Sequence, residues 1–152
     1  MVSDAQDTDR VAVGFAEAAD FGWLVDNDEH LEDGVIRQKI EFQEYVVSKV
    51  AHAPVGFMRL SLFWSFIPFI DLIRVQEQYQ GRGVARAMLN YLEEAAGERG
   101  RTLIMSSCST DESDSRLWHI KSGFTESGQL DDLHPIQDGA EIFFVKRISQ
   151  AA

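Results

Sequence analysis

The chain has 152 residues and a formal net charge of −11, with 45% hydrophobic and 26% charged residues. Both fractions are ordinary for a soluble globular protein, and the length suits one core, so we expect a single domain over residues 1–152. The acidic balance excludes broad nucleic-acid binding, which requires a basic face to displace counterions. It favours a cationic partner over an anionic one, although acidity also serves solubility alone.

No apolar run reaches the roughly 20 residues that a membrane-spanning helix needs. The longest run, Leu60–Ile73, is interrupted by two serines, a proline and an aspartate. Residues Met1–Arg10 are acidic and polar, unlike a secretory signal. Cys108 is the only cysteine, which excludes an internal disulfide and suits a reducing compartment. We therefore predict a cytoplasmic protein without a membrane partner.

The first half of the chain predicts short strands around two weakly helical stretches. Alternating apolar residues predict a first strand over 11–13, and the helical stretches cover 17–26 and 31–40. Three strands rich in β-branched and aromatic residues follow. They cover 42–50, 55–62 and 69–75, with a turn at His52–Pro54 and a break at Ser65–Pro68.

The clearest helix starts near Gly83 and ends at Gly97 and Gly100. One apolar face with a 3.6-residue period defines it, formed by Val84, Met88, Tyr91, Leu92 and Ala95. A strand buried on both faces is predicted over 102–108, a helix over 111–121 capped by Ser109 or Thr110, and a last strand over 142–148. This order predicts a mixed sheet with helices on its faces, in which residues 69–108 form a β-α-β unit.

The most informative segment is the turn Gln80–Ala85, between a predicted strand and the clearest helix. Glycines at 81 and 83 permit positive φ angles and let an anion approach the backbone closely. The first turn of the helix contains no acid and instead has Arg82 and Arg86 beside it, which favours an anionic ligand at the helix start. The alternative is a tight strand-to-helix connection with solubilising arginines.

Two segments carry a family resemblance. Gln80-Gly81-Arg82-Gly83-Val84-Ala85 resembles the Q/R-x-x-G-x-G/A signature of the GNAT superfamily of acyl-CoA N-acyltransferases. Leu117–Phe124 resembles that family's second signature, a helix ending in lysine, one residue and then Gly-Phe. Val75 and Tyr79 also stand where the family has these residue types. The resemblance is strong over Phe42–Phe124 and continues through Glu141–Lys146.

The resemblance implies an α/β (α+β) fold with a mixed, mostly antiparallel central sheet of six to seven strands. The sheet would splay at the cofactor site, and about four helices would flank it. It also implies an N-acetyltransferase that uses acetyl-CoA as cosubstrate, with direct attack of an amine on the thioester in a ternary complex. The turn would bind the pyrophosphate, and the strand end would pair with the pantetheine arm. The implied cofactor-binding residues are Arg74, Val75, Gln80, Gly81, Arg82, Gly83, Val84, Ala85 and Arg86.

Two residues are candidates for proton transfer. His119 stands where the family commonly has a tyrosine that protonates the leaving thiolate, and a histidine can donate a proton near neutral pH. The alternative is a partly buried structural histidine. Asp71 lies in an apolar run, where a carboxylate is costly unless it is paired or functional, so it is a candidate base beside ordered water. Its alternative is an ion pair with Arg59 or Arg74.

The remaining reactive residue types give weaker indications. Cys108 is more typical of a small buried hydrophobic residue than of a nucleophile. Histidines 30, 52, 119 and 134 lack the spacing of metal ligands, so we predict no metal.

Acidic segments at 26–33, 111–114 and 131–132, with aromatic residues at 63, 64 and 66, favour a cationic acceptor. Its class is a polyamine, an aminoglycoside-like amine or a basic peptide, and a homodimer stays open. The alternatives are a non-catalytic acyl-CoA-binding module on the same fold and an unrelated phospholigand-binding domain.

Overall fold

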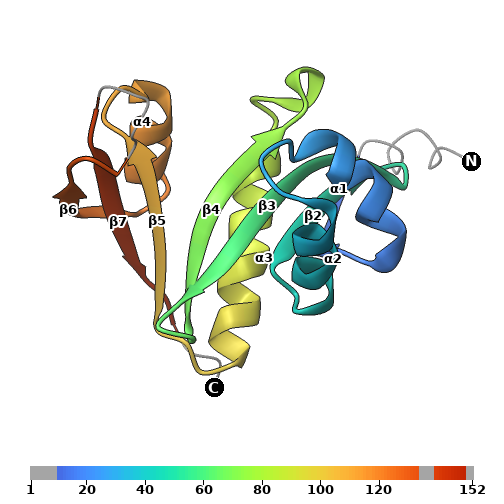
Figure 1. Ribbon diagram of the computed structural model, residues 1–152, viewed down its shortest axis with the longest axis horizontal. Helices are drawn as coiled ribbons and strands as arrows, with labels where there is room; N and C mark the ends of the chain where they lie inside the picture. The colour runs from blue at the N-terminus through green and yellow to red at the C-terminus, as the bar shows by residue number, and fades with distance from the viewer. Residues whose placement is uncertain (1–9, 134–138, 150–152) are drawn as a thin grey trace, which may run out of the picture. The chain divides into compact units, whose positions relative to one another are not determined.

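The computed structural model describes residues 10–133 and 139–149, so His134 lies outside the described residues. Four α-helices, two short 3-10 helices and seven strands follow one another along this part of the chain (Figure 1). In order they are β1 (Val11–Phe15), η1 (Ala18–Asp20), α1 (Phe21–Asn27), α2 (Asp33–Glu41), β2 (Tyr45–Val50), β3 (Ala53–Phe63), β4 (Ile67–Val75), η2 (Glu77–Tyr79), α3 (Val84–Glu98), β5 (Leu103–Ser109), α4 (Ser113–Lys121), β6 (Thr125–Leu130) and β7 (Glu141–Arg147).

The strands pair in the order β1-β2-β3-β4-β5-β7-β6. β4 and β5 run parallel, as a β-α-β unit requires, while the β1–β2, β2–β3, β5–β7 and β6–β7 pairs are antiparallel. The predicted mixed, mostly antiparallel sheet with about four flanking helices is therefore confirmed.

Contacts divide the chain into two compact units. Unit 1 comprises Met1–Leu60 and Leu72–Leu92, and unit 2 comprises Ser61–Asp71 and Glu93–Ala152. The division falls within β3, β4 and α3, so these elements contribute residues to both units.

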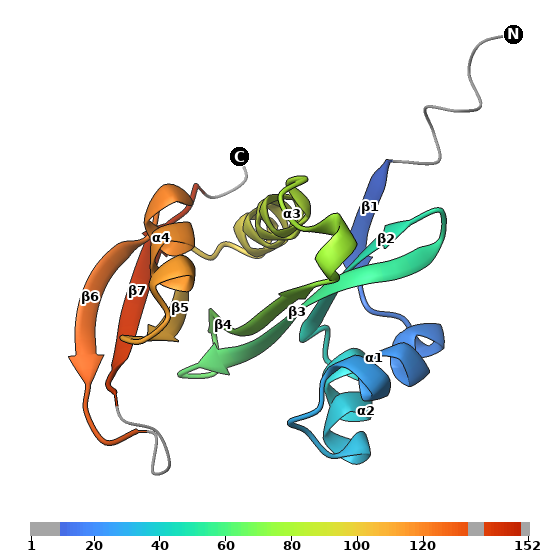
Figure 2. The same cartoon turned by 90° about the horizontal axis from the view of Figure 1, so that it is seen from above.

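Unit 1 is built on β1–β3 and the end of β4. Figure 2 shows α1 and α2 on one face of these strands and the start of α3 on the other. The core between the strands and the first two helices contains Leu24, Ile36, Tyr45, Val47 and Phe57. Each such side chain contributes about 1.5–3 kcal/mol by leaving water, which fixes α1 and α2 on the sheet.

Unit 2 contains β5, β7 and β6, the hairpin between β3 and β4, and α4. Phe144 of β7 is fully buried, and Ile104, Ser106 and Cys108 alternate as the buried residues of β5. The residues between them are only partly buried, so of the two faces predicted to be buried, one is buried and the other is partly buried. Alternation places Ser106 on the same face as Cys108.

The turn before β3 lies earlier than predicted. Ala51 and His52 have φ angles of 49° and 68°, and the strand already begins at Ala53. Pro54 is therefore inside β3, opposite Lys49, where a register shift interrupts the ladder with β2. A proline is tolerated at such an irregularity because it has no N–H to donate.

The start of α4 and the strand after it also differ from the sequence pattern. The helix begins at Ser113, so Glu112 is its N-cap residue and the predicted caps are wrong. The hydroxyls of Ser109 and Thr110 instead accept hydrogen bonds from the backbone N–H groups of Asp111 and Ala140. All six residues of β6 are exposed, so it lacks the apolar alternation that reveals a strand, and only the upper limit of the predicted strand number includes it.

Candidate functional site

The turn before α3 has the backbone that the sequence predicts. Gly81 and Gly83 have φ angles of 73° and 80°, in the left-handed region that side chains rarely occupy. Helix α3 begins at the next residue, Val84, which is buried and anchors the helix start in unit 1. The two glycines thus reverse the chain between η2 and α3.

The start of α3 presents donors rather than acids. The N–H of Ala87 donates to Gly83 O at 3.0 Å, and this is the first bond of the helix. The N–H groups of residues 84–86 precede it and are therefore open to an external acceptor. The first turn contains no acidic residue, and both Arg82 and Arg86 are exposed. This arrangement favours a bound anion.

The turn is tied to the end of β4. Gln80 Nε2 donates to Val75 O at 3.0 Å, and Gln76 N–H donates to Val55 O at 2.8 Å. The exposed guanidinium of Arg74 donates to the carbonyl of Ile73 at 3.2 Å. The structure therefore brings the predicted residues of the strand end and of the turn together in unit 1.

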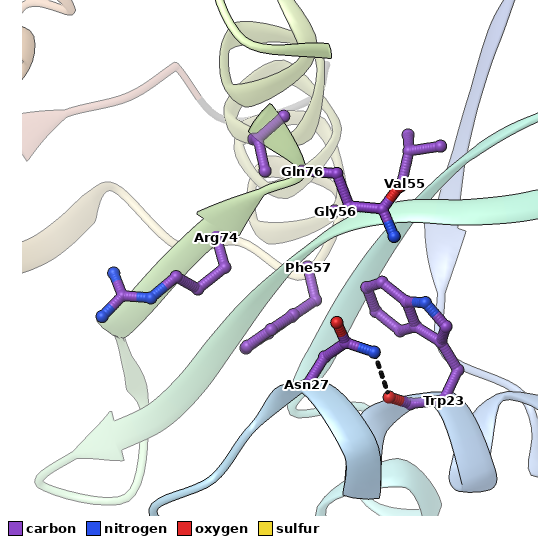
Figure 3. A pocket seen from close by; sticks show the side chains of 8 residues that line it. Trp23, Asn27, Val55, Gly56, Phe57, Arg74 and Gln76 are labelled. Carbon is purple, nitrogen blue, oxygen red and sulfur yellow. Dashed lines mark hydrogen bonds between the residues drawn. The ribbon is translucent and has the colours of Figure 1, made fainter. Parts of the chain in front are cut away.

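A pocket of about 170 Å³ lies beside this strand end (Figure 3). Trp23 and Asn27 of α1 line it opposite residues 55–57 of β3, residues 74 and 75 of β4 and Gln76, which follows β4. The rings of Trp23 and Phe57 meet edge to face at 5.9 Å, and Asn27 Nδ2 donates to Trp23 O at 2.7 Å. The lining is aromatic with two carboxamides and one guanidinium, which suits a ligand with amide and apolar groups.

Asp28, the residue after α1, forms a buried charged cluster with Tyr45 and Arg59. Asp28 is 1% exposed and accepts hydrogen bonds from Tyr45 Oη and Arg59 Nη1, both at 2.6 Å. Burial, and then the bond to Asp28, raise the pKa of Tyr45 far above its ordinary value, so the phenol stays protonated and donates. Asp28 belongs to the acidic segment predicted beside the acceptor, and it is a structural anion of unit 1.

Asp71 lies in unit 2, partly buried on β4. Its Oδ2 accepts a hydrogen bond from Ser61 Oγ at 2.6 Å, across the hairpin.

His119 lies on α4 and is almost completely buried, at 3% exposure. Its Nδ1 is 2.7 Å from the carbonyl oxygen of Ser115, and its Nε2 is 2.7 Å from Ser106 Oγ. The ring stacks on Phe144 with centroids 4.3 Å apart and planes 10° apart. Packing and hydrogen bonds thus fix the orientation of the imidazole.

The pKa of His119 is lowered from its ordinary value because burial disfavours the charged ring. The hydrogen bond to the Ser115 carbonyl and the charge of Glu141 oppose this effect without cancelling it. The imidazole is therefore neutral at neutral pH. Burial likewise raises the pKa of the Cys108 thiol, which makes it a poor nucleophile.

Sequence reasoning missed three groups of residues. They are Ser106, the Asp28–Tyr45–Arg59 cluster, and the α1 residues Trp23 and Asn27. Ser106 had a signal, because it is a hydroxyl at a buried position of an alternating strand. The other residues had none, since their roles depend on which strands lie next to α1.

Within the described ranges, no group of three or more histidine, cysteine or acidic residues is arranged to hold a metal ion. No helix there is long and apolar enough to cross a membrane.

Comparison with known proteins gives one family. Residues 17–124, more than two thirds of the chain, match the model of the acetyltransferase (GNAT) family. No curated protein matches the sequence. Solved structures share the fold, but their sequence identities are too low to show that this chain has the same activity.

Three of them illustrate this likeness. A GNAT-family acetyltransferase from Bacillus cereus has a TM-score of 0.77 and 22% identity over 93% of this chain and 99% of its own. The ribosomal-protein-S18-alanine N-acetyltransferase of Escherichia coli has a TM-score of 0.78 and 16% identity over 94% and 97%. The Salmonella typhimurium protein yncA, solved with its cofactor acetyl-CoA, has a TM-score of 0.74 and 16% identity over 93% and 96%.

Proposed function

Because the chain belongs to the acetyltransferase (GNAT) family, we propose that it transfers an acetyl group from acetyl-CoA to a primary amine. The observation that carries this proposal is the acid-free start of α3, preceded by two glycines with positive φ and flanked by two exposed arginines. The family match covers segments of both compact units, so we propose that residues 1–152 act as one domain.

In this proposal the pyrophosphate of acetyl-CoA binds the turn Gln80–Ala85. The backbone N–H groups at the start of α3 donate to the phosphate oxygens, and the helix dipole adds to their attraction. Arg82 and Arg86 are exposed beside the turn, where their charges stabilise a bound anion. Val84 and Ala85 contribute backbone donors only, since Val84 has its side chain in the core.

The pantetheine arm follows the strand end at Arg74 and Val75. Its amide groups resemble a peptide and can pair with the backbone of an extended strand. The pocket beside Val75 supports this path, because it offers the carboxamides of Asn27 and Gln76 between apolar walls. Arg74 is the one charged residue in that lining.

The reaction proceeds by direct attack of the amine on the thioester in a ternary complex. An incoming ammonium must lose a proton before attack, and the departing thiolate must gain one. We assign the first step to Asp71, whose Oδ2 accepts a hydrogen bond from Ser61 Oγ at 2.6 Å. We assign proton exchange with the leaving sulfur to His119.

The acceptor is a cationic small molecule or a basic peptide, because the net charge of −11 attracts such amines. The single cysteine supports a reducing compartment, the cytoplasm.

One observation favours a second function, a non-catalytic acyl-CoA-binding module. His119 is buried and both of its ring nitrogens already have protein partners. If neither the amine nor the thioester contacts this histidine, its role is to hold α4 in place, and the chain then binds acyl-CoA without transferring the acyl group.

Calorimetry with acetyl-CoA, followed by a thiol-release assay with polyamines, an aminoglycoside and basic peptides, separates the two functions. Binding together with amine-dependent CoA release supports the transferase. Tight binding without release for every amine supports the module, and no binding contradicts both.

A further inference from the structure

The pocket beside the end of β4 lies entirely within unit 1. Its walls come from α1, β3 and the segment around Val75, and all of these residues belong to that compact unit. Its volume of about 170 Å³ is below the ~300 Å³ at which pockets for whole drug-sized ligands begin. We therefore expect it to hold one short segment of a ligand, and its polar groups indicate which segment.

Asn27 presents a hydrogen-bond acceptor to this pocket. Its Nδ2 donates to the Trp23 carbonyl oxygen at 2.7 Å, one helical turn earlier in α1. This bond determines which end of the carboxamide faces the helix, because only the nitrogen can donate. Figure 3 shows the other end, Oδ1, turned toward Phe57. Asn27 therefore offers a carbonyl oxygen to a ligand in the pocket.

Gln76 presents a donor from the opposite wall. Its backbone N–H donates to Val55 O at 2.8 Å, which holds the residue against β3. Figure 3 shows the Nε2 of its side chain turned toward Trp23. Its Oε1 lies 3.5 Å from Gln78 Nε2, and a hydrogen bond of this length leaves the carboxamide free to adjust to a ligand. Gln76 can thus donate to a ligand oxygen.

The one charged side chain of the lining is directed elsewhere. The guanidinium of Arg74 donates to Ile73 O at 3.2 Å, and Figure 3 shows it turned away from Trp23 and Asn27. Asp28, the residue after Asn27, is 1% exposed and already forms an ion pair inside unit 1. The two carboxamides are therefore the polar groups that face a ligand, and both are neutral. A charged ligand group would lose water here without gaining an opposite charge.

We propose that this pocket binds a secondary amide, whose N–H donates to Asn27 Oδ1 and whose carbonyl oxygen accepts from Gln76 Nε2. In a trans amide these two groups point in opposite directions, which suits a donor and an acceptor on opposed walls. The partly buried ring of Trp23 covers the apolar atoms beside the amide. A ligand without the amide leaves both carboxamides unpaired, so the pocket discriminates against it.

This inference deepens the proposed function and rests on it for the source of the amide. The pantetheine arm of the cosubstrate contains secondary amides, and so does a peptide acceptor. A polyamine contains none, and neither does an aminoglycoside such as kanamycin. If the acceptor supplies the amide, Asn27 and Gln76 select a basic peptide from the three acceptor classes. With either source, these two side chains determine specificity.

The test measures the binding of three probes to the full chain by calorimetry. Pantetheine and N-acetyl-lysine methylamide contain secondary amides, whereas kanamycin has ammonium and hydroxyl groups only. Gln76→Met and Asn27→Leu keep the size of each side chain and remove its hydrogen bond to the ligand. Gln38→Met and Asn90→Leu are the matched controls, at exposed positions of α2 and α3 outside the lining of the pocket.

We expect each pocket variant to bind an amide-bearing probe about 3- to 10-fold more weakly than its control, the effect of one hydrogen bond. Weaker binding of pantetheine assigns the site to the cosubstrate, and weaker binding of the lysine derivative assigns it to a peptide acceptor. Either result supports the amide site. Kanamycin should bind each pocket variant and its control equally.

Three results would overturn the amide site. They are a wild type that binds neither amide-bearing probe, pocket variants that bind both of these probes like their controls, and an equal loss of affinity for kanamycin. The proposed transferase is tested separately, by CoA release from acetyl-CoA. A wild type that shows the expected losses of affinity but releases no CoA with any amine supports the amide site and contradicts the transferase.

Discussion

Gln80 is tied to Val75 by a 3.0 Å hydrogen bond from its side-chain amide to the backbone carbonyl. The bond joins the first residue of the glycine turn to the last residue of β4. It therefore fixes the turn against the strand end, and both are proposed to hold the same cosubstrate. Preorganisation of this kind raises affinity because less conformational freedom is lost on binding.

Removing this bond should weaken acetyl-CoA binding. Gln80→Ala should raise the Kd for acetyl-CoA by about 3- to 10-fold, since an exposed hydrogen bond contributes about 0.5–1.5 kcal/mol. Calorimetry measures this change. Gln78→Ala is the control, because the exposed Gln78 side chain donates only a long hydrogen bond of 3.5 Å, to Gln76 Oε1, and the variant should bind like the wild type. Equal affinities of the two variants would contradict the role of Gln80.

The buried cluster of unit 1 should be important for stability. Tyr45→Phe removes the 2.6 Å bond to Asp28 and leaves a buried carboxylate with one fewer donor. We expect it to lower the free energy of unfolding by about 1.5–3 kcal/mol, measured by urea denaturation. Tyr91→Phe keeps the ring contact with Phe15 at 5.2 Å and should cost far less. A Tyr45→Phe variant as stable as Tyr91→Phe would refute this role of Asp28.

How much the sequence reveals depends on whether a feature is local. The turn at 80–85 and the helix behind it could be predicted, because glycine φ angles, acid-free helix starts and apolar periodicity are properties of neighbouring residues. β6 could not be found with certainty, because its six residues are all exposed and only pairing with β7 makes it a strand.

Partners from distant segments could not be predicted either. In the sequence, Asp28 is one of the acids of segment 26–33 that favour a cationic acceptor, whereas in the structure it accepts hydrogen bonds from Tyr45 and Arg59. In the same way, His119 could be singled out from its motif, but its partner Ser106 depends on how α4 packs on β5.

The lowered pKa of His119 should appear in the pH dependence of stability. The unfolded chain takes up a proton near pH 6.5, whereas the folded histidine stays neutral to lower pH, so the unfolded state binds more protons in this window. Stability is therefore lost as the pH falls below about 6.5. Urea titrations should show that the free energy of unfolding falls more from pH 7 to pH 5 in the wild type than in His119→Phe, which has no imidazole at this position.

His52→Asn is the control for that experiment. His52 is exposed in a turn with φ of 68°, which asparagine tolerates, so its removal should leave the pH slope unchanged. A difference between wild type and His119→Phe that is constant with pH would show that His119 titrates normally.

His119→Phe should also separate catalysis from binding. The phenyl ring can keep the stack on Phe144 but cannot exchange a proton. Steady-state kinetics should show kcat reduced by about 100-fold or more, with the Kd for acetyl-CoA little changed. Wild-type turnover would exclude His119 from the proton transfer.

The most direct test of the central claim compares Gly83→Asp with Gly83→Asn by acetyl-CoA calorimetry. Both side chains have the same shape and tolerate the φ of 80°, and no atom lies within 4 Å of a Cβ at this position, so the two variants differ mainly in charge. If the pyrophosphate binds this turn, Gly83→Asp should bind acetyl-CoA about 100-fold or more weakly than Gly83→Asn, because like charges in contact cost several kcal/mol. Equal affinities of the two folded variants would contradict the account.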